Sequence, residues 1–183
     1  MSKQLEWDID EIISDINIPW KKLQGKTILI TGASGLLGKL IVKTLLRLGE
    51  KTGISCRVIG LVRNEKKARN VFENEINAYG QPKLIVSDIR DFIEAQEKVD
   101  YIIHAASETA SRSFIERPVE VTETAILGTD NLLRIARDQA VEGMVFLSTM
   151  EVYGTPQDEK KLSEEEVLQV DPSVVRNSYP IGK

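Results

Sequence analysis

The sequence contains little cysteine, little histidine and no long apolar run. One of its 183 residues is a cysteine, Cys56, so no disulfide can form within the chain and a reducing compartment is expected. Because His104 is the only histidine, a transition-metal site of the usual ligand types is not expected. No apolar run reaches the roughly 18 residues of a spanning helix, and the acidic start MSKQLEWDID is unlike a signal peptide.

An excess of positive charge is also missing. The chain has 24 Lys and Arg against 28 Asp and Glu, a net charge of −4, which gives no reason to expect nucleic acid or an anionic membrane as a partner. The apolar content of 42% and the charged content of 28% are ordinary for a globular protein. We therefore expect one domain with a sizeable core, in a soluble and cytoplasmic protein.

The most informative stretch is KTILITGASGLLG, residues 26–38. It predicts an apolar strand over 27–31, a turn containing Gly32, Gly35 and Gly38, and a helix over 36–46. Such glycines serve a tight turn, close approach of the backbone to a pyrophosphate, and close packing of helix on strand. Phosphates would then meet the free N–H groups at the positive end of the helix. The stretch indicates a loop that binds a nicotinamide dinucleotide.

Strands and helices alternate along the chain. The alternation predicts a parallel, doubly wound α/β sheet with right-handed crossovers, whose ligands bind outside the carboxyl ends of the strands. Gly32, Arg63, Asp88, Ala105 and Thr149 are all expected at that edge. The apolar pattern places strands at 27–31, 57–62, 83–86, 99–103 and 143–147, and helices at 36–46, 64–76, 92–96 and 119–139.

The residue after the second strand bears on the choice of cofactor. An enzyme that selects NAD usually has an acidic residue there, which accepts hydrogen bonds from the ribose 2′-hydroxyl. This sequence has Arg63, which can pair with a 2′-phosphate and so favours NADP. The alternative is that Arg63 stacks on the adenine or is merely solvated.

Two other strand ends carry polar side chains. Asp88 follows the third strand and can accept a hydrogen bond from the adenine amino group, cap the segment 92–96, or do both. His104 ends the fourth strand, where a satisfied, partly buried histidine is favoured over a catalytic one. Ala105, Ala106 and Ser107 follow it and are small enough to let a cofactor pass close to the backbone.

The end of the chain suggests chemistry. Tyr179 and Lys183 are four residues apart, so they would share one face of a helix. A lysine ammonium beside a phenol favours the phenolate, which can act as a general base toward a substrate hydroxyl. Such a pair is common, but here it follows a glycine turn and a strand ending in Ser148 and Thr149, and that combination is specific.

Two helices suggest packing contacts. Residues 1–24 form a predicted N-terminal extension, in which apolar residues at spacings of three and four indicate an amphipathic helix before the domain at 25–183. That helix either docks on the domain or contacts another subunit. Gly128, inside the helix 119–139, suggests close packing against the sheet or against another subunit.

The motifs TGASGLLG, HAAS, LGTDNLL, STMEVYG and YPIGK together resemble those of extended short-chain dehydrogenases/reductases, in the nucleotide-sugar epimerase/dehydratase/decarboxylase branch. The resemblance implies a Rossmann fold, NAD(P) as cofactor, a nucleotide-sugar substrate and a homodimer. Such enzymes continue beyond the Tyr-x-x-x-Lys motif into a substrate-binding domain. We therefore expect this chain to hold most of the cofactor domain, without that second part, and not to turn over by itself.

The resemblance also implies roles for individual residues. Tyr179 would be the base, Lys183 would orient the nicotinamide ribose, and Thr149 would bind the sugar's 4-oxygen; hydride transfer from C4 would then give a 4-keto sugar nucleotide. The implied cofactor contacts are Gly32, Ser34, Gly35, Leu36, Leu37 and Gly38 at the pyrophosphate, Arg63 at the ribose, Asp88 and Ile89 at the adenine, and Ala105, Ala106, Ser107, Thr124, Ser148, Tyr179 and Lys183 along the rest of the cofactor.

The branch depends on Met150 and Glu151. Dehydratases of this family carry Thr-Asp-Glu, but here Met150 replaces the acid and cannot donate a proton, which argues against a dehydratase. Glu151 is present, as in UDP-glucuronate decarboxylases, which also resemble the chain in an arginine shortly before the tyrosine, Arg176 here. The alternatives are an NADPH-dependent carbonyl reductase of the same superfamily and a catalytically silent dinucleotide-binding protein.

Overall fold

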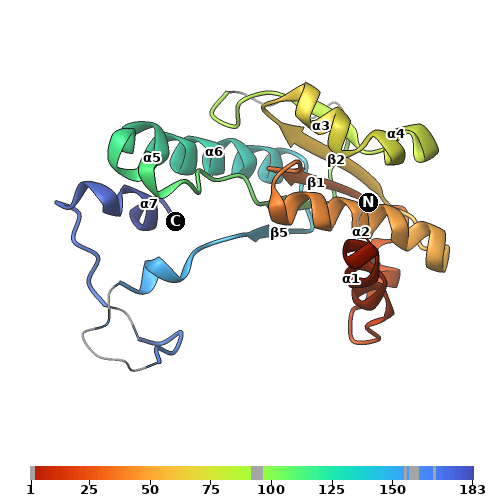
Figure 1. Cartoon of the computed structure of the whole chain (residues 1–183), viewed down its shortest axis with the longest axis horizontal. Coiled ribbons are helices and arrows are strands. Elements are labelled where there is room, and N and C mark those ends of the chain that lie inside the picture. Colours follow the sequence, from red (N-terminus) through yellow and green to blue (C-terminus); the bar gives the residue numbers. More distant parts are fainter. Residues whose placement is uncertain (1–2, 92–96, 155, 157–160, 167) are drawn as a thin grey trace.

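A computed structural model describes residues 3–91, 97–154, 156, 161–166 and 168–183 of the chain. In this part of the chain, five parallel strands form one sheet in the order β3-β2-β1-β4-β5 (Figure 1). This order confirms the predicted doubly wound sheet, because the chain moves outward from β1 first on one side and then on the other. The strands are β1 (Thr27–Thr31), β2 (Arg57–Val62), β3 (Lys83–Val86), β4 (Tyr101–His104) and β5 (Gly143–Phe146).

The first three strands have the predicted bounds, whereas β4 begins two residues later than predicted and ends one residue later. Asp100, just before the start of β4, already bonds to β1, because its N–H donates to the Thr27 carbonyl at 2.8 Å. The Val99 N–H donates to the side chain of Gln139 at 2.6 Å, and the Asp100 carboxylate accepts the Thr27 N–H at 2.8 Å. β5 ends at Phe146, one residue before the predicted end.

Helices cover both faces of the sheet and give three layers (Figure 1). Alternate β1 residues enter different cores: Ile28 and Ile30 pack with α2 (Leu36–Thr52) and α3 (Glu65–Val71), while Leu29 packs with α6 (Pro118–Asp138). This alternation is typical of a strand that is buried on both faces. α2 runs six residues beyond its predicted end and stops at Gly53, which is left-handed with φ 74°.

The helix predicted over 64–76 is two helices in the structure. α3 ends at Val71, and α4 (Glu73–Tyr79) begins after Phe72, whose backbone has left helical geometry at φ −112° and ψ 16°. The Phe72 side chain is fully buried in the core beneath α2, and the Lys43 ammonium lies 5.7 Å from its ring centroid. The break is therefore associated with the burial of Phe72, which the helical pattern alone does not reveal.

The remaining elements bring the end of the chain beside the sheet. The helix predicted over 119–139 is α6, which is preceded by α5 (Ser111–Glu116). The segment predicted as a helix over 92–96 lies outside the described residues.

No helix in the described ranges is both long and apolar enough to cross a membrane. The short elements are η1 (Trp20–Leu23), η2 (Met150–Tyr153), η3 (Val175–Asn177) and α7 (Ser178–Ile181).

The N-terminal helix α1 (Lys3–Ser14) packs against α2. Ile9 and Ile13 are buried in a small core with Leu48. The Asp10 carboxylate accepts hydrogen bonds from Arg47 at 2.7 Å and Lys51 at 3.0 Å, and these two bonds lower the pKa of Asp10 to about 2. α1 is thus attached to the domain by apolar burial and by charge.

We predict that Ile9→Ala lowers the free energy of unfolding by about 3 kcal/mol, because it empties a fully buried site. The matched control is Ile16→Ala, since Ile16 is 94% exposed and its loss should change stability by less than about 0.5 kcal/mol. Urea unfolding of both variants measures the difference. Equal effects would contradict the docking of α1 through Ile9.

Candidate functional site

A cavity of about 530 Å³ opens at the carboxyl ends of β1 to β4. Thirteen of the residues predicted to contact a cofactor line it, although they come from five separate parts of the chain. The strand ends bring them together because parallel strands all end at the same edge of the sheet. They are Gly32, Ser34, Gly35, Leu36, Leu37, Gly38, Arg63, Asp88, Ile89, Ala105, Ala106, Ser107 and Thr124.

The turn after β1 has no room for side chains at two of its glycines. Gly32 has φ 63°, and a Cβ there would lie 2.9 Å from the backbone of Ala105 and Ala106. A Cβ on Gly38 would lie 2.2 Å from the Gly32 carbonyl oxygen. The turn therefore offers bare backbone at the start of the 17-residue helix α2, a shape and a positive dipole that suit a pyrophosphate. The residues present fit the diphosphate of a dinucleotide.

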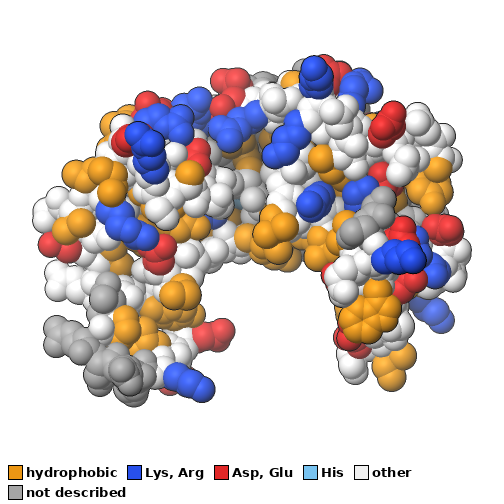
Figure 2. Space-filling view, viewed as in Figure 1, with side chains coloured by type: hydrophobic (Ala, Val, Ile, Leu, Met, Phe, Trp, Pro, Cys, Tyr) orange, Lys and Arg blue, Asp and Glu red, His pale blue; other side chains and the backbone are white. Residues whose placement is uncertain are grey.

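The β2 end of the cavity is basic. Arg63 and Lys67 both line it and both are exposed, so each can meet an anionic group. Asn64 lies between them and caps α3, its side-chain oxygen accepting the Lys67 N–H at 2.8 Å. In the space-filling view, Lys and Arg side chains gather around α3 (Figure 2). Lys67 was not among the predicted site residues, although its place four residues after Arg63 could have indicated it.

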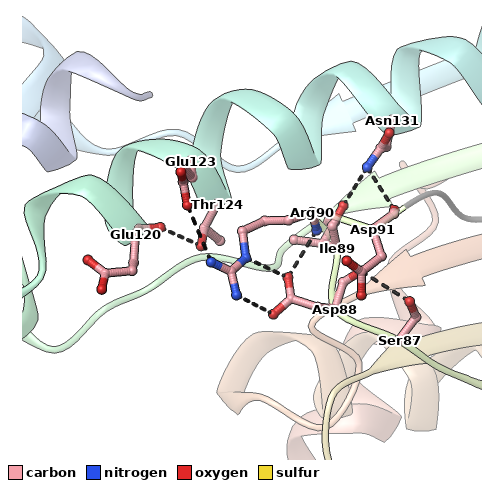
Figure 3. Close-up of polar contacts among 9 residues, drawn as sticks. All are labelled: Ser87, Asp88, Ile89, Arg90, Asp91, Glu120, Glu123, Thr124 and Asn131. Atoms are coloured by element: carbon pink, nitrogen blue, oxygen red, sulfur yellow. Dashed lines mark hydrogen bonds and ion pairs between the residues drawn. The ribbon is translucent and has the colours of Figure 1, made fainter.

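Asp88 lies in the cavity wall and is held by Arg90, which sequence reasoning missed. Arg90 donates to both carboxylate oxygens, from Nε at 3.0 Å and from a terminal nitrogen at 3.1 Å (Figure 3). This pairing lowers the pKa of the Asp88 carboxyl. On the neighbouring helix, the Thr124 hydroxyl donates to the Glu120 carbonyl at 2.7 Å.

His104 is buried beside the cavity as a satisfied histidine, in agreement with the reading favoured from the sequence. Its Nδ1 is 2.8 Å from the Thr31 hydroxyl oxygen, which also accepts the Ala106 N–H at 3.0 Å. Burial lowers the pKa of His104 to about 4, and the charge of Lys183 acts in the same direction. The ring is therefore neutral at pH 7 and helps to fix the cavity wall at Ala106.

The other predicted site residues lie beyond the end of β5, outside the cavity wall. Tyr179 stacks on Phe114 with ring centroids 4.3 Å apart, and the Lys183 ammonium lies 5.9 Å from the Tyr179 ring centroid. Lys183 follows the end of α7, so the predicted shared helix face extends only as far as Ile181. Lys183 donates to the Leu147 carbonyl at 2.8 Å, and burial lowers the pKa of Lys183.

Thr149 and Glu151 lie in or beside η2, next to α7. The Thr149 oxygen accepts the Glu151 N–H at 3.4 Å, and Ser148 before it is exposed. The Glu151 carboxylate accepts two hydrogen bonds from Arg176, at 2.5 and 3.2 Å, and the pairing lowers the pKa of Glu151. Met150 is 84% exposed.

Acidic side chains do not gather into a metal site in the described part of the chain. No group of three or more His, Cys, Asp or Glu residues there is placed to hold a metal ion. The site thus consists of a cavity of about 530 Å³ and, beyond the end of β5, a tyrosine with a nearby lysine.

Comparison with known proteins agrees with this geometry. Residues 28–183 match the NAD dependent epimerase/dehydratase family. A protein of Methanocaldococcus jannaschii, described as an uncharacterized membrane protein, is 36% identical over 127 residues, which are 68% of this chain and 36% of that protein. Cinnamoyl-CoA reductase 1 of Petunia hybrida is 28% identical over 171 residues, 89% of this chain and 48% of the reductase.

Two further matches concern nucleotide sugars. UDP-glucose 4-epimerase of Rickettsia rickettsii is 32% identical over 130 residues, 68% of this chain and 36% of the epimerase. The structure of DesIV, a dTDP-glucose 4,6-dehydratase of Streptomyces venezuelae with NAD and TYD bound, has a TM-score of 0.66 and 28% identity, covering 86% of this chain and 48% of that one. The chain thus spans between about a third and a half of the length of these relatives.

We predict that Gly38→Ala weakens NAD binding at least about tenfold, because the new methyl group forces the turn away from Gly32. The matched control is Gly49→Ala in the same helix, where the nearest atom would be 3.6 Å from the Cβ. Gly49→Ala should leave binding unchanged and stabilise the helix by about 0.5–1 kcal/mol. Calorimetric titration measures the affinities, and equal affinities would argue against a role for the turn in cofactor binding.

Proposed function

The chain belongs to the NAD-dependent epimerase/dehydratase family, and we propose that the protein acts on a nucleoside-diphosphate sugar, which it oxidises at C4 with a tightly held NAD(P). The observation that carries the proposal is the cavity in which thirteen predicted cofactor contacts converge, with Tyr179 and Lys183 near the next strand end. The UDP-glucose 4-epimerase and the dTDP-glucose dehydratase among its relatives support this class of substrate.

In this proposal the chain's own residues bind the substrate and move one proton. The bound cofactor supplies a reversible hydride acceptor. Tyr179 removes the proton of the sugar's 4-hydroxyl, and Thr149 donates a hydrogen bond to the same oxygen. The Lys183 ammonium lies 5.9 Å from the Tyr179 ring centroid, and in this proposal it orients the nicotinamide ribose.

Met150 and Glu151 together lack the proton donor that a dehydratase of this family uses. Arg176 holds Glu151 as a carboxylate, which accepts protons and does not supply them at neutral pH. Met150, where a dehydratase of this family has its acid, offers a thioether. A decarboxylase expels no hydroxyl group and therefore needs no such acid. A 4-keto uronic acid loses carbon dioxide readily, because the carbanion that remains is delocalised into the ketone.

A second candidate is a reductase that consumes NADPH. Arg63 and Lys67 line the cavity at the β2 end, where a 2′-phosphate would lie, and cinnamoyl-CoA reductase 1 is among the relatives. A catalytically silent dinucleotide-binding protein is a third possibility, which the presence of both Tyr179 and Lys183 disfavours.

We also propose that the protein forms a homodimer through α6. Val119, Ile126 and Leu133 are each more than half exposed on this helix, and Val119 and Ile126 line a shallow hollow on its outer face. Exposed apolar side chains grouped on one helix are typical of a protein interface. A second copy of the same helix would cover them.

We predict that the complete gene product converts one member of a panel of UDP-, dTDP-, GDP- and CDP-sugars without net consumption of nicotinamide, followed by NMR. Tyr179→Phe should lower turnover at least about 100-fold, the size of a general-base effect, and leave cofactor affinity within about threefold. Conversion that appears only with added NADPH and a carbonyl substrate would establish the reductase instead. Near-normal turnover by Tyr179→Phe would remove this residue from the mechanism.

We predict that Arg63→Ala weakens NADP binding by about 10- to 100-fold, the value of a hydrogen bond to a charged group, and NAD binding by less than about threefold. Lys66→Ala is the matched control, because Lys66 is exposed in the first turn of α3, close to Arg63 in the sequence, and is not part of the cavity lining. Fluorescence titration with both cofactors gives the ratios. Equal losses of NAD and NADP would refute the pairing of Arg63 with a 2′-phosphate.

A further inference from the structure

The segment from Ser87 to Asp91, which we name the β3 loop, is attached to α6 by hydrogen bonds from Asn131. The Asn131 amide nitrogen donates to the Ile89 carbonyl at 2.9 Å and to the Asp91 carbonyl at 2.8 Å (Figure 3). These two bonds use both hydrogens of the amide group. The backbone on each side of Arg90 is thereby fixed to the helix.

Close packing adds to these bonds. Gly128 lies one turn before Asn131, and a Cβ there would lie 2.9 Å from a side-chain carbon of Ile89. Arg90 reaches from the loop back to α6, where a terminal nitrogen is 3.5 Å from the Glu123 carboxylate. Thus Gly128, Asn131 and Glu123 all hold the loop against the helix, although Asp88 and Ile89 face the cavity.

The Asp88 carboxylate uses most of its acceptor positions on Arg90. Its Oδ1 accepts two donors from Arg90, the backbone N–H at 3.0 Å and Nε at 3.0 Å, and its Oδ2 accepts one at 3.1 Å. A carboxylate oxygen accepts about two hydrogen bonds, so one acceptor position remains, on Oδ2. Arg90 also holds the group as an anion, which accepts hydrogen bonds and donates none.

The order of the strands indicates what faces that position. The sheet runs β1, β2, β3 outward from the glycine turn, so a dinucleotide with its pyrophosphate at Gly32 and its ribose at Arg63 directs its base to the end of β3. Adenine has an exocyclic amino group, which is a donor. Hypoxanthine has a carbonyl oxygen at the same place, which would face the anion as a second acceptor.

We infer that Arg90 and Asn131 are positioning residues that make the site selective for adenine over hypoxanthine, by holding the Asp88 carboxylate with one acceptor position toward the base. The inference rests on the proposed function only in requiring that a dinucleotide binds in this cavity. It assigns specificity to two residues that lie outside the cavity lining and act through Asp88 and the β3 loop.

The test measures binding of NAD and of its hypoxanthine analogue, nicotinamide hypoxanthine dinucleotide, to the complete protein by calorimetry. We expect the wild type to prefer NAD by about tenfold or more, the effect of one hydrogen bond to a charged acceptor. Arg90→Ala and Asn131→Ala should each reduce this preference to about threefold or less. Arg90→Lys should restore little of it, because an ammonium lacks the planar fork that reaches both oxygens.

The matched control is Arg134→Ala. Arg134 forms an ion pair with Asp130 at 2.8 Å on the exposed part of α6, so its loss should leave the preference unchanged. Melting temperatures of all variants separate misfolding from loss of selectivity, since a misfolded site loses both ligands together.

The outcomes separate the two proposals. Failure of the wild type to bind either dinucleotide would overturn the proposed function and this inference with it. If the wild type binds NAD but shows no preference, or if the folded Arg90→Ala and Asn131→Ala variants keep the full preference, this inference alone is overturned. A selective loss in both variants, with Arg134→Ala unaffected, supports it.

Discussion

The architecture of the site depends on the close approach of the turn after β1 to the backbone after β4. Gly32 lies so near Ala105 and Ala106 that a Cβ would be 2.9 Å from their atoms. The Thr31 hydroxyl strengthens this approach, because it accepts the Ala106 N–H and lies within hydrogen-bond distance of His104. One wall of the cavity is thereby fixed by backbone, which leaves the helix N-terminus free for an anion.

The same strand end connects the cavity to the tyrosine and lysine. His104, which lies within hydrogen-bond distance of Thr31, packs on Phe146 with ring centroids 5.2 Å apart. The Lys183 ammonium lies 4.8 Å from the ring centroid of the same Phe146, on β5. Because His104 is buried and neutral, it places no second positive charge near Lys183. The two parts of the site are therefore joined by packed side chains across neighbouring strands.

Much of this arrangement could be predicted from the sequence, because buried parallel strands are short apolar runs and their carboxyl ends meet at one edge. The bounds of β1, β2 and β3 and the residues around the cavity follow from that. Partners that depend on tertiary contacts could not be predicted. Arg90 and Arg176 gave no local sign that they hold Asp88 and Glu151, and the break at Phe72 accompanies the burial of this side chain beneath α2.

The carboxylates of the site share one property. Asp88 and Glu151 each accept two or more N–H groups of an arginine, and this pairing lowers the pKa of both carboxyl groups. Carboxylates held in this way accept hydrogen bonds and are poor proton donors. Under the proposed function, the proton of the substrate oxygen is then taken and returned by Tyr179. This division of roles suits epimerisation or decarboxylation, in which one group can do both, better than elimination, which needs a separate acid for the leaving hydroxyl.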